Sequence, residues 1–250
     1  MQGTIKALKL EVRHILGSKL HLLLLFVIPA IVVVAFASAG KDSYIYPGTE
    51  VTLYDYYAPG IFATVIFFIT TQLAVLRIVA ERAPYGTLDR DLLAISRRGM
   101  FFGKFLANMM VGFCQCILIF LIGKGIYDVK ITGDSILVLS LFFLTALVGL
   151  SAGLLLSVST KTKDQANQLV PFVILFSLVL SGIMIPLEKM PAALKEASNY
   201  LPLTLSYSGL KDVMLNGKGV EDLISPILFL TLWTAIFLII GVSKFSVERK

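Results

Sequence analysis

Six long stretches of this chain contain no charged residue and consist mostly of aliphatic and aromatic side chains. They are residues 20–40, 56–76, 105–123, 135–160, 165–187 and 223–243, each between 19 and 26 residues long. A helix rises about 1.5 Å per residue and the hydrocarbon core of a bilayer is about 30 Å thick, so each stretch can cross a membrane. None has the polar outer face that a helix of a soluble bundle carries. The pattern predicts an all-α polytopic membrane protein with six transmembrane helices in a single domain, 1–250.

The distribution of basic residues predicts the orientation of these helices. With the N-terminus inside, the inner segments hold 15 of the 22 Lys and Arg residues, whereas most of the acidic residues fall outside. An excess of Lys and Arg marks cytoplasmic loops. We therefore expect a multi-pass protein of the cytoplasmic (plasma) membrane with both termini in the cytoplasm. The basic pI of about 9.3 follows from these loops and indicates contact with anionic lipid, not with nucleic acid.

The first apolar stretch has a second interpretation. Ala37-Ser38-Ala39 resembles a signal-peptidase site that follows a basic segment and an apolar run. The run is longer than a usual signal core, which favours a retained span, and the intact mass would distinguish the two.

Residues 1–19 carry the pattern of an amphipathic helix. Apolar side chains recur at helical spacing, with basic residues on other faces: Ile5, Leu8, Val12, Ile15 and Leu16 are apolar, and Lys6, Lys9 and Arg13 are basic. This favours a helix in the membrane interface over a straight extension of the first span, because Gly17-Ser18 favours a bend.

A charged segment, ERAPYGTLDRDLLAISRRG, separates the second and third apolar stretches. Thr87 is a suitable N-cap, acidic residues follow it and Arg97-Arg98 lie near the end, as the helix dipole favours. Leu88, Leu92 and Ile95 share one face. The residues alone allow two interpretations equally, a helix resting on lipid or a helix that fits a groove on a soluble partner.

Several kinds of chemistry lack their usual motifs. The sequence has no GxxxxGK[ST] phosphate loop and no HExxH motif, and Cys114 and Cys116 lie on different helix faces. We expect no catalytic, cofactor-binding or metal site. Proton- or sodium-coupled transport is disfavoured, because it usually needs a carboxylate or a base near mid-bilayer and the six stretches contain none there; His14 and His21 lie near the cytoplasmic end of the first span. Neutral polar residues remain, each more typical of hydrogen bonding between helices than of ligand binding: Thr70, Thr71, Gln72, Asn108, Gln115, Asn167 and Gln168.

Proline residues predict irregular helices. Pro29 and Pro171 lie inside the first and fifth spans, where they should kink or open the helix. Residues 181–219 alternate short apolar pieces with prolines and charges. This segment is too broken for another span, and short re-entrant helices dipping into the outer leaflet before the sixth span would account for it.

Two motifs resemble those of ABC-2-type permeases, the transmembrane subunits of one class of ABC exporter. The first is ERAPYGTLDRDLLA followed by GMFFGKFLANMMVGFCQ, which is similar to the ER-x-x-GTL-x-x-LL segment and the Gly-Lys pair of that family. The second runs from Ser181-Gly182 through Pro202-Leu203-Thr204 to Gly217 and is similar to the passage before the family's last span. Lys211 stands where the family often has Arg, and Ile95-Ser96 where it often has Pro.

The resemblance implies a function and a set of contacts. Residues 81–98 would be the coupling helix that docks on an ABC ATPase subunit, which would bind ATP and Mg²⁺ and perform the hydrolysis, so this chain would not itself be an enzyme. The candidates for that contact are Glu81, Arg82, Gly86, Thr87, Leu88 and Leu92. Two permease copies, as a homodimer or with a related chain, would enclose a path for which Thr70, Thr71, Gln72 and Asn108 are candidates.

The expected function is therefore ATP-driven export of an amphipathic or hydrophobic substrate, such as a drug, a lipid or a lipid-linked glycan. Two alternatives stay open: a membrane scaffold or immunity protein that transports nothing, and a channel or secondary carrier.

Overall fold

The computed structural model describes residues 2–17, 19–44, 51–82, 96–160 and 162–244 as helices joined by turns. The α-helices are α1 (Gln2–Gly17), α2 (Lys19–Gly40), α3 (Leu53–Arg82), α5 (Arg97–Phe120), α6 (Ser135–Ser159), α7 (Lys163–Leu180), α8 (Ala192–Ser198), α9 (Pro202–Met214) and α10 (Ile224–Lys244). A π-helical turn, η1 (Leu121–Ile126), continues α5, and two 3₁₀ turns are η2 (Leu187–Lys189) and η3 (Glu221–Leu223). The predicted all-α class is confirmed.

Four of these helices are long and apolar enough to cross a bilayer. They cover Leu53–Ala80, Gly99–Ile126, Ser135–Ser159 and Glu221–Lys244. The apolar part of α2, Leu25–Gly40, is shorter, and α7 ends at Leu180, before the end of the charge-free stretch 165–187. The helix is shorter than the charge-free stretch because Gly182 takes a φ of +83° and turns the chain. The absence of charged residues carries no information about such a turn.

Side-chain caps define the starts of α5, α6 and α7. Ser96 accepts a hydrogen bond from Gly99 N at the start of α5, and Asp134 accepts one from Ile136 N at the start of α6. Thr162 caps α7 in the same way through Gln165 N. Such caps satisfy backbone N–H groups that the first turn leaves without a partner.

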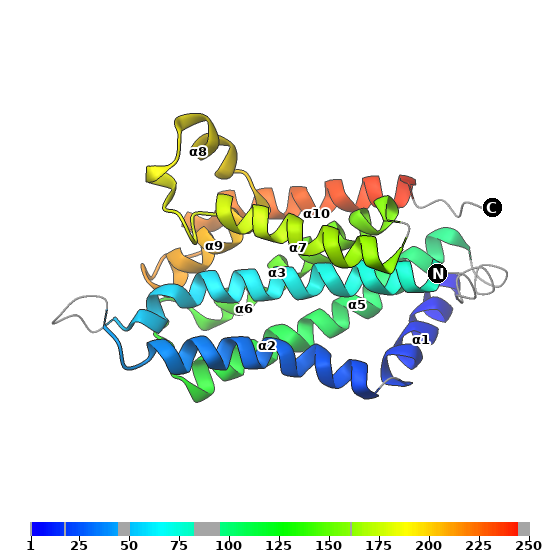
Figure 1. Ribbon diagram of the computed structural model, residues 1–250, viewed down its shortest axis with the longest axis horizontal. Helices are drawn as coiled ribbons and strands as arrows, with labels where there is room; N and C mark the ends of the chain where they lie inside the picture. Colours follow the sequence, from blue (N-terminus) through cyan, green and yellow to red (C-terminus); the bar gives the residue numbers. More distant parts are fainter. Residues whose placement is uncertain (1, 18, 45–50, 83–95, 161, 245–250) are drawn as a thin grey trace.

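Helix α3 lies at the centre of the bundle, with α2 on one side and α7 and α10 on the other (Figure 1). It packs closely along α6, where Gly149 and Gly153 face it one turn apart. A Cβ atom on Gly149 would lie 2.9 Å from Phe67 O, and one on Gly153 would lie 2.8 Å from Ala74 Cβ. Small residues four apart allow two membrane helices to approach this closely. The spacing of these glycines was visible in the sequence, but their partner helix was not.

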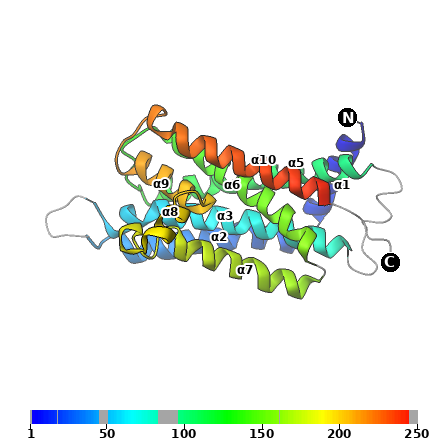
Figure 2. The same ribbon diagram turned by 90° about the horizontal axis from the view of Figure 1, so that it is seen from above.

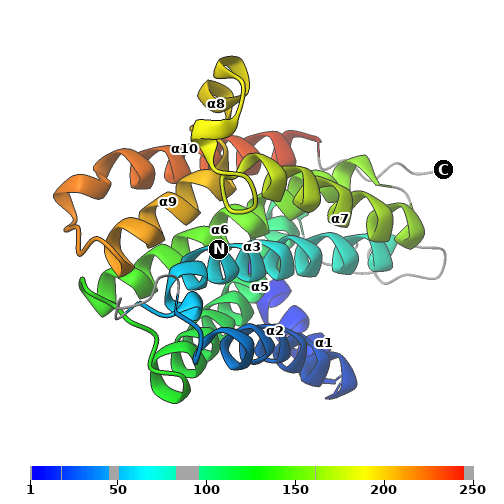
Figure 3. The ribbon, with the colours of Figure 1, turned by 60° about the vertical axis from the view of Figure 1, so that its left-hand side comes forward.

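The two ends of the bundle differ. Helix α1 crosses one end at a steep angle to α2 (Figure 1), and the C-terminal end of α10 lies at that same end (Figure 2). Helix α8 lies at the opposite end (Figure 1) and projects out of the bundle (Figure 3). The sequence 181–219 forms the short helices η2, α8 and α9, as its prolines predicted, and α9 packs against α3, α6 and α10.

Candidate functional site

Helix α1 buries one face against the start of α5. Ala7, Glu11 and Ile15 are buried, while Ile5 and Leu16, which were predicted on the apolar face, are 49% and 62% exposed. Gly103 of α5 makes the approach possible, since a Cβ atom there would lie 2.9 Å from Leu8 N. The predicted N-terminal helix is present, but the face that it buries differs from the predicted apolar face and includes Glu11.

Glu11 joins three helices through two ion pairs. Its Oε1 lies 2.9 Å from Arg77 Nη2 of α3, and its Oε2 accepts a hydrogen bond of 3.0 Å from Lys104 Nζ of α5. The side chains of Glu11 and Lys104 are 1% and 2% exposed, and that of Arg77 is 10% exposed. Charges this well buried are retained in proteins when they are paired. Lys104 belongs to the Gly-Lys pair of the sequence motif, but no local pattern identifies Glu11 or Arg77 as its partners.

Two residues of this buried ion cluster, Arg77 and Lys104, lie before and after the predicted coupling helix in the sequence. Arg77 lies near the end of α3 and Lys104 near the start of α5, and the segment between these helices contains residues 83–95. Glu81 and Arg82 form the last two positions of α3. The other candidates for the ATPase contact lie outside the described residues: Gly86, Thr87, Leu88 and Leu92.

Farther along α5, polar side chains continue on the face that bears Lys104. Gln115 Nε2 donates a 3.0 Å hydrogen bond to Leu25 O of α2. Pro29 lies four residues after Leu25 and has no N–H to offer that carbonyl, so Gln115 supplies the donor that the proline lacks. The expectation that Gln115 forms a hydrogen bond between helices is confirmed. Asn108 is also buried, and its amide atoms have no partner among the described residues.

The predicted path residues on α3 face in two directions. Thr70 and Thr71 are fully buried against α6, and their hydroxyls donate to Ile66 O and Phe67 O of their own helix at 2.7 Å. Gln72 is half-buried instead, on the same side of α3 as the half-buried Phe68 and Leu76. Within one chain, therefore, Gln72 reaches the surface, while Thr70, Thr71 and Asn108 are enclosed. Their assignment to a path stays a prediction.

Helix α7 exposes polar and aromatic side chains. Ala166, Val170 and Ile174 are buried in the bundle, whereas Asn167, Gln168, Phe172 and Phe176 are exposed. The helix packs along α3.

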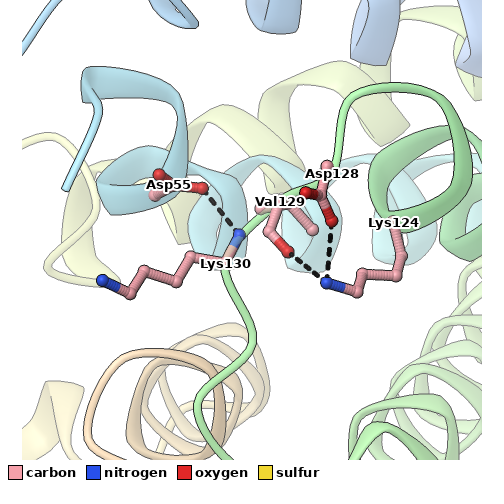
Figure 4. A network of polar contacts seen from close by, with 5 residues as sticks. All are labelled: Asp55, Lys124, Asp128, Val129 and Lys130. Carbon is pink, nitrogen blue, oxygen red and sulfur yellow. Dashed lines mark hydrogen bonds and ion pairs between the residues drawn. The ribbon is translucent and has the colours of Figure 1, made fainter. Parts of the chain in front are cut away.

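A polar network holds the opposite end of α3 (Figure 4). Asp55 Oδ1 accepts a 2.7 Å hydrogen bond from Lys130 N, and its Oδ2 accepts from both Thr52 N and Thr52 Oγ1. Thr52 Oγ1 in turn caps the helix by accepting from Asp55 N at 3.1 Å. Nearby, Lys124 Nζ lies 2.9 Å from Asp128 Oδ1, and this hydrogen bond lowers the pKa of Asp128 below its ordinary value. Asp55 thus ties the start of α3 to the loop after α5.

The described residues contain no group of three or more His, Cys, Asp or Glu side chains placed to hold a metal ion. The site consists of closely packed helices joined by buried ion pairs and hydrogen bonds.

Comparison with known proteins identifies the family. The family described as ABC-2 family transporter protein matches residues 38–243. The chain is 28% identical over 198 residues to ABC transporter G family member 20 of Dictyostelium discoideum, covering 78% of this chain and 27% of that protein. It is 29% identical over 195 residues to the probable multidrug ABC transporter permease YbhS of Escherichia coli K12, covering 76% and 49%.

A third relative is the linearmycin resistance permease protein LnrN of Bacillus subtilis, 23% identical over 163 residues that cover 64% of this chain and 42% of LnrN. The chain therefore spans between about a quarter and a half of the length of these relatives. Because the family match runs from the end of α2 to the end of α10, the chain belongs to the ABC-2 transporter family and is a transmembrane component of an ABC transporter.

Proposed function

We propose that this chain is the permease subunit of an ABC exporter whose energy comes from an ABC ATPase subunit. ATP and Mg²⁺ would be bound by that subunit, and this chain would contribute no catalytic residue, in keeping with its lack of a GxxxxGK[ST] loop. The observation that carries the proposal is the buried cluster of Glu11, Arg77 and Lys104, which joins α1 to the helices on both sides of segment 83–95 in a chain of the ABC-2 family.

The cluster gives segment 83–95 a rigid base. A soluble motor that pushes on this segment must move the end of α3 and the start of α5, and Glu11 holds both to α1. Close packing of α3 on Gly149 and Gly153 then carries the displacement into α6. Packed interiors transmit such shifts because they do not compress. Glu81, Arg82, Gly86, Thr87, Leu88 and Leu92 are the proposed contacts with the ATPase.

We assign the substrate path to the face that α3 and α7 leave partly open. Gln72 and Phe68 of α3 are half-buried, and Asn167, Gln168 and Phe172 are exposed on α7, which packs along α3. A second permease copy, identical or related, would close this face and enclose the path. Its neutral polar and aromatic lining suits an amphipathic or hydrophobic substrate better than an ion. Thr70, Thr71 and Asn108 would support the path from behind.

The topology that accompanies this function has six spans, with α2 and α7 crossing the bilayer in addition to the four long helices. The end that carries α1 and the last residues of α10 would face the cytoplasm, as the basic residues of the sequence favour. The short helices η2, α8 and α9 would then lie in the outer leaflet of the plasma membrane.

The names of two relatives agree with a drug-like cargo. One is called a probable multidrug ABC transporter permease and another a linearmycin resistance permease. We therefore place drugs first among the proposed substrates, followed by lipids and lipid-linked glycans.

ATPase stimulation tests the proposal. The chain is reconstituted in lipid with a candidate ATPase subunit, and hydrolysis is measured with the wild type and with Glu81→Lys or Leu92→Asp. We expect the wild-type chain to stimulate hydrolysis and both variants to lose the effect. The matched control, Glu196→Lys on α8 at the opposite end, is expected to retain it.

The alternatives predict different results. A scaffold or immunity protein would bind the ATPase without changing hydrolysis, and a channel or secondary carrier would move substrate without nucleotide. Stimulation that survives both substitutions would show that residues 81–98 are not the contact.

A further inference from the structure

A groove runs along the outer side of α1 where this helix meets α5. It has a volume of about 610 Å³ and is lined by Leu8, Lys9, Val12, Arg13, Leu16, Gly17 and Met110. The lining is apolar apart from Lys9 and Arg13, which lie one helical turn apart and are exposed. The buried ion cluster lies on the other side of α1, so the groove is separate from it.

We propose that this groove binds one anionic phospholipid, with the phosphate held by Lys9 and Arg13 and an acyl chain lying along Leu8, Val12, Leu16 and Met110. The proposal does not depend on ATP-driven transport, since it concerns only how α1 is seated in the membrane.

The charges of the groove favour an anionic headgroup. Neither Lys9 nor Arg13 forms an ion pair with a carboxylate in the described part of the chain, because the acidic residue of α1, Glu11, points inward to Arg77 and Lys104. Two cations at positions i and i+4 on one helix present their donors to a single anion. Their attraction to anionic lipid adds to the burial of apolar surface in binding a helix to the interface.

The apolar part of the groove favours a lipid over a soluble anion. Leu16 is 62% exposed and Met110 is 52% exposed, and Phe102 and Phe113 are exposed on the same helix as Met110. A free phosphate would occupy only the basic rim and make no contact with this apolar surface. A lipid would cover it with a hydrocarbon chain while its phosphate reaches the two basic side chains.

The experiment measures lipid retention by native mass spectrometry of the full chain purified from nanodiscs that contain equal amounts of phosphatidylglycerol and phosphatidylcholine. We expect the wild type to retain phosphatidylglycerol preferentially. The double variant Lys9→Gln/Arg13→Gln should bind it roughly 25-fold more weakly, because each basic residue near an anionic surface contributes about fivefold. The double control Lys6→Gln/Lys163→Gln removes two exposed charges that do not line the groove, and it should keep the preference.

A second variant tests the apolar part. Met110→Trp fills the groove without changing charge and should also reduce retention, whereas Met184→Trp, at another exposed position, should not. Equal retention of the two lipids by the wild type, an equal loss in the Lys6/Lys163 control, or full retention by Met110→Trp would overturn the proposal. Displacement of the lipid by millimolar inorganic phosphate would also overturn it, because it would identify the site as one for a soluble anion.

Discussion

The ammonium group of Lys104 lies 3.0 Å from the carboxylate of Glu11, 93 residues away in the sequence, and both side chains are almost completely buried. Arg77 approaches the other oxygen of the same carboxylate. Glu11 is thus the shared partner of two buried cations. Its removal should therefore be more damaging than the removal of either cation.

Glu11→Gln should lower the free energy of unfolding by about 3–5 kcal/mol, because two buried cations then lose the carboxylate that they share. Lys104→Met should cost less, since Glu11 keeps its pair with Arg77. Thermal unfolding in a mild detergent measures the order, with Lys6→Gln as an exposed control on the same helix as Glu11. Equal effects of Glu11→Gln and Lys104→Met would show that the two ion pairs do not share one carboxylate in solution.

Gln115→Leu should destabilise the chain by about 0.6–2 kcal/mol, because Leu25 O then loses its donor inside an apolar environment. Pro29→Ala restores a backbone N–H four residues after that carbonyl. In the double variant Pro29→Ala/Gln115→Leu, the loss caused by Gln115→Leu should therefore be largely absent. A double-mutant cycle measured by unfolding tests this coupling, and additive effects of the two substitutions would contradict it.

Gly153→Val should separate α3 from α6, because its side chain would meet the backbone of Thr71 and the Cβ atom of Ala74. Overpacking of this kind typically costs about 1–3 kcal/mol. Gly125→Val is the matched control, since a Cβ atom there meets nothing within 4 Å. Unfolding in detergent should show a lower midpoint for Gly153→Val than for Gly125→Val. Similar midpoints would mean that α3 and α6 are not in close contact.

Asn108→Leu should raise the thermal midpoint, because Asn108 is 1% exposed and its amide atoms have no partner among the described residues. Replacing an unpaired buried amide by an apolar group of similar shape removes a penalty of about 1–3 kcal/mol. Gln72→Leu, at a half-buried position, should change stability by less than about 0.5 kcal/mol. A lower midpoint for Asn108→Leu would show that this amide is hydrogen-bonded, as a lining residue of a wet path would be.

Helix positions were predictable to the extent that charge and proline control them. Local sequence pattern predicted the N-terminal helix, the irregular segment 181–219 and the apolar helices. The end of α7 is an exception. Its charge-free stretch continues to Leu187, but the left-handed backbone of Gly182 turns the chain soon after Leu180. Hydropathy records which residues tolerate lipid and contains no information about φ.

The sequence motif predicted where the candidate site lies in the chain. It did not predict which side chains contact one another there. The ER-x-x-GTL-x-x-LL segment and the Gly-Lys pair pointed to the family, and the match over residues 38–243 agrees. Glu11 looked like an ordinary acidic residue on an amphipathic helix, because nothing local shows that α1 turns that side inward. Thr70, Thr71 and Gln72 are adjacent in sequence, yet two of them pack against α6 and one reaches the surface.

The sequence by itself determined the all-α class and the apolar helices, because backbone polar groups in hydrocarbon must be satisfied within each helix. Its motifs pointed to the transporter family. The tertiary structure alone decided which polar side chains meet. The rotation of each helix about its axis depends on contacts such as Gly153 on Thr71 and Ala7 on Gly103. Those contacts join segments far apart in the chain, and helical periodicity does not specify them.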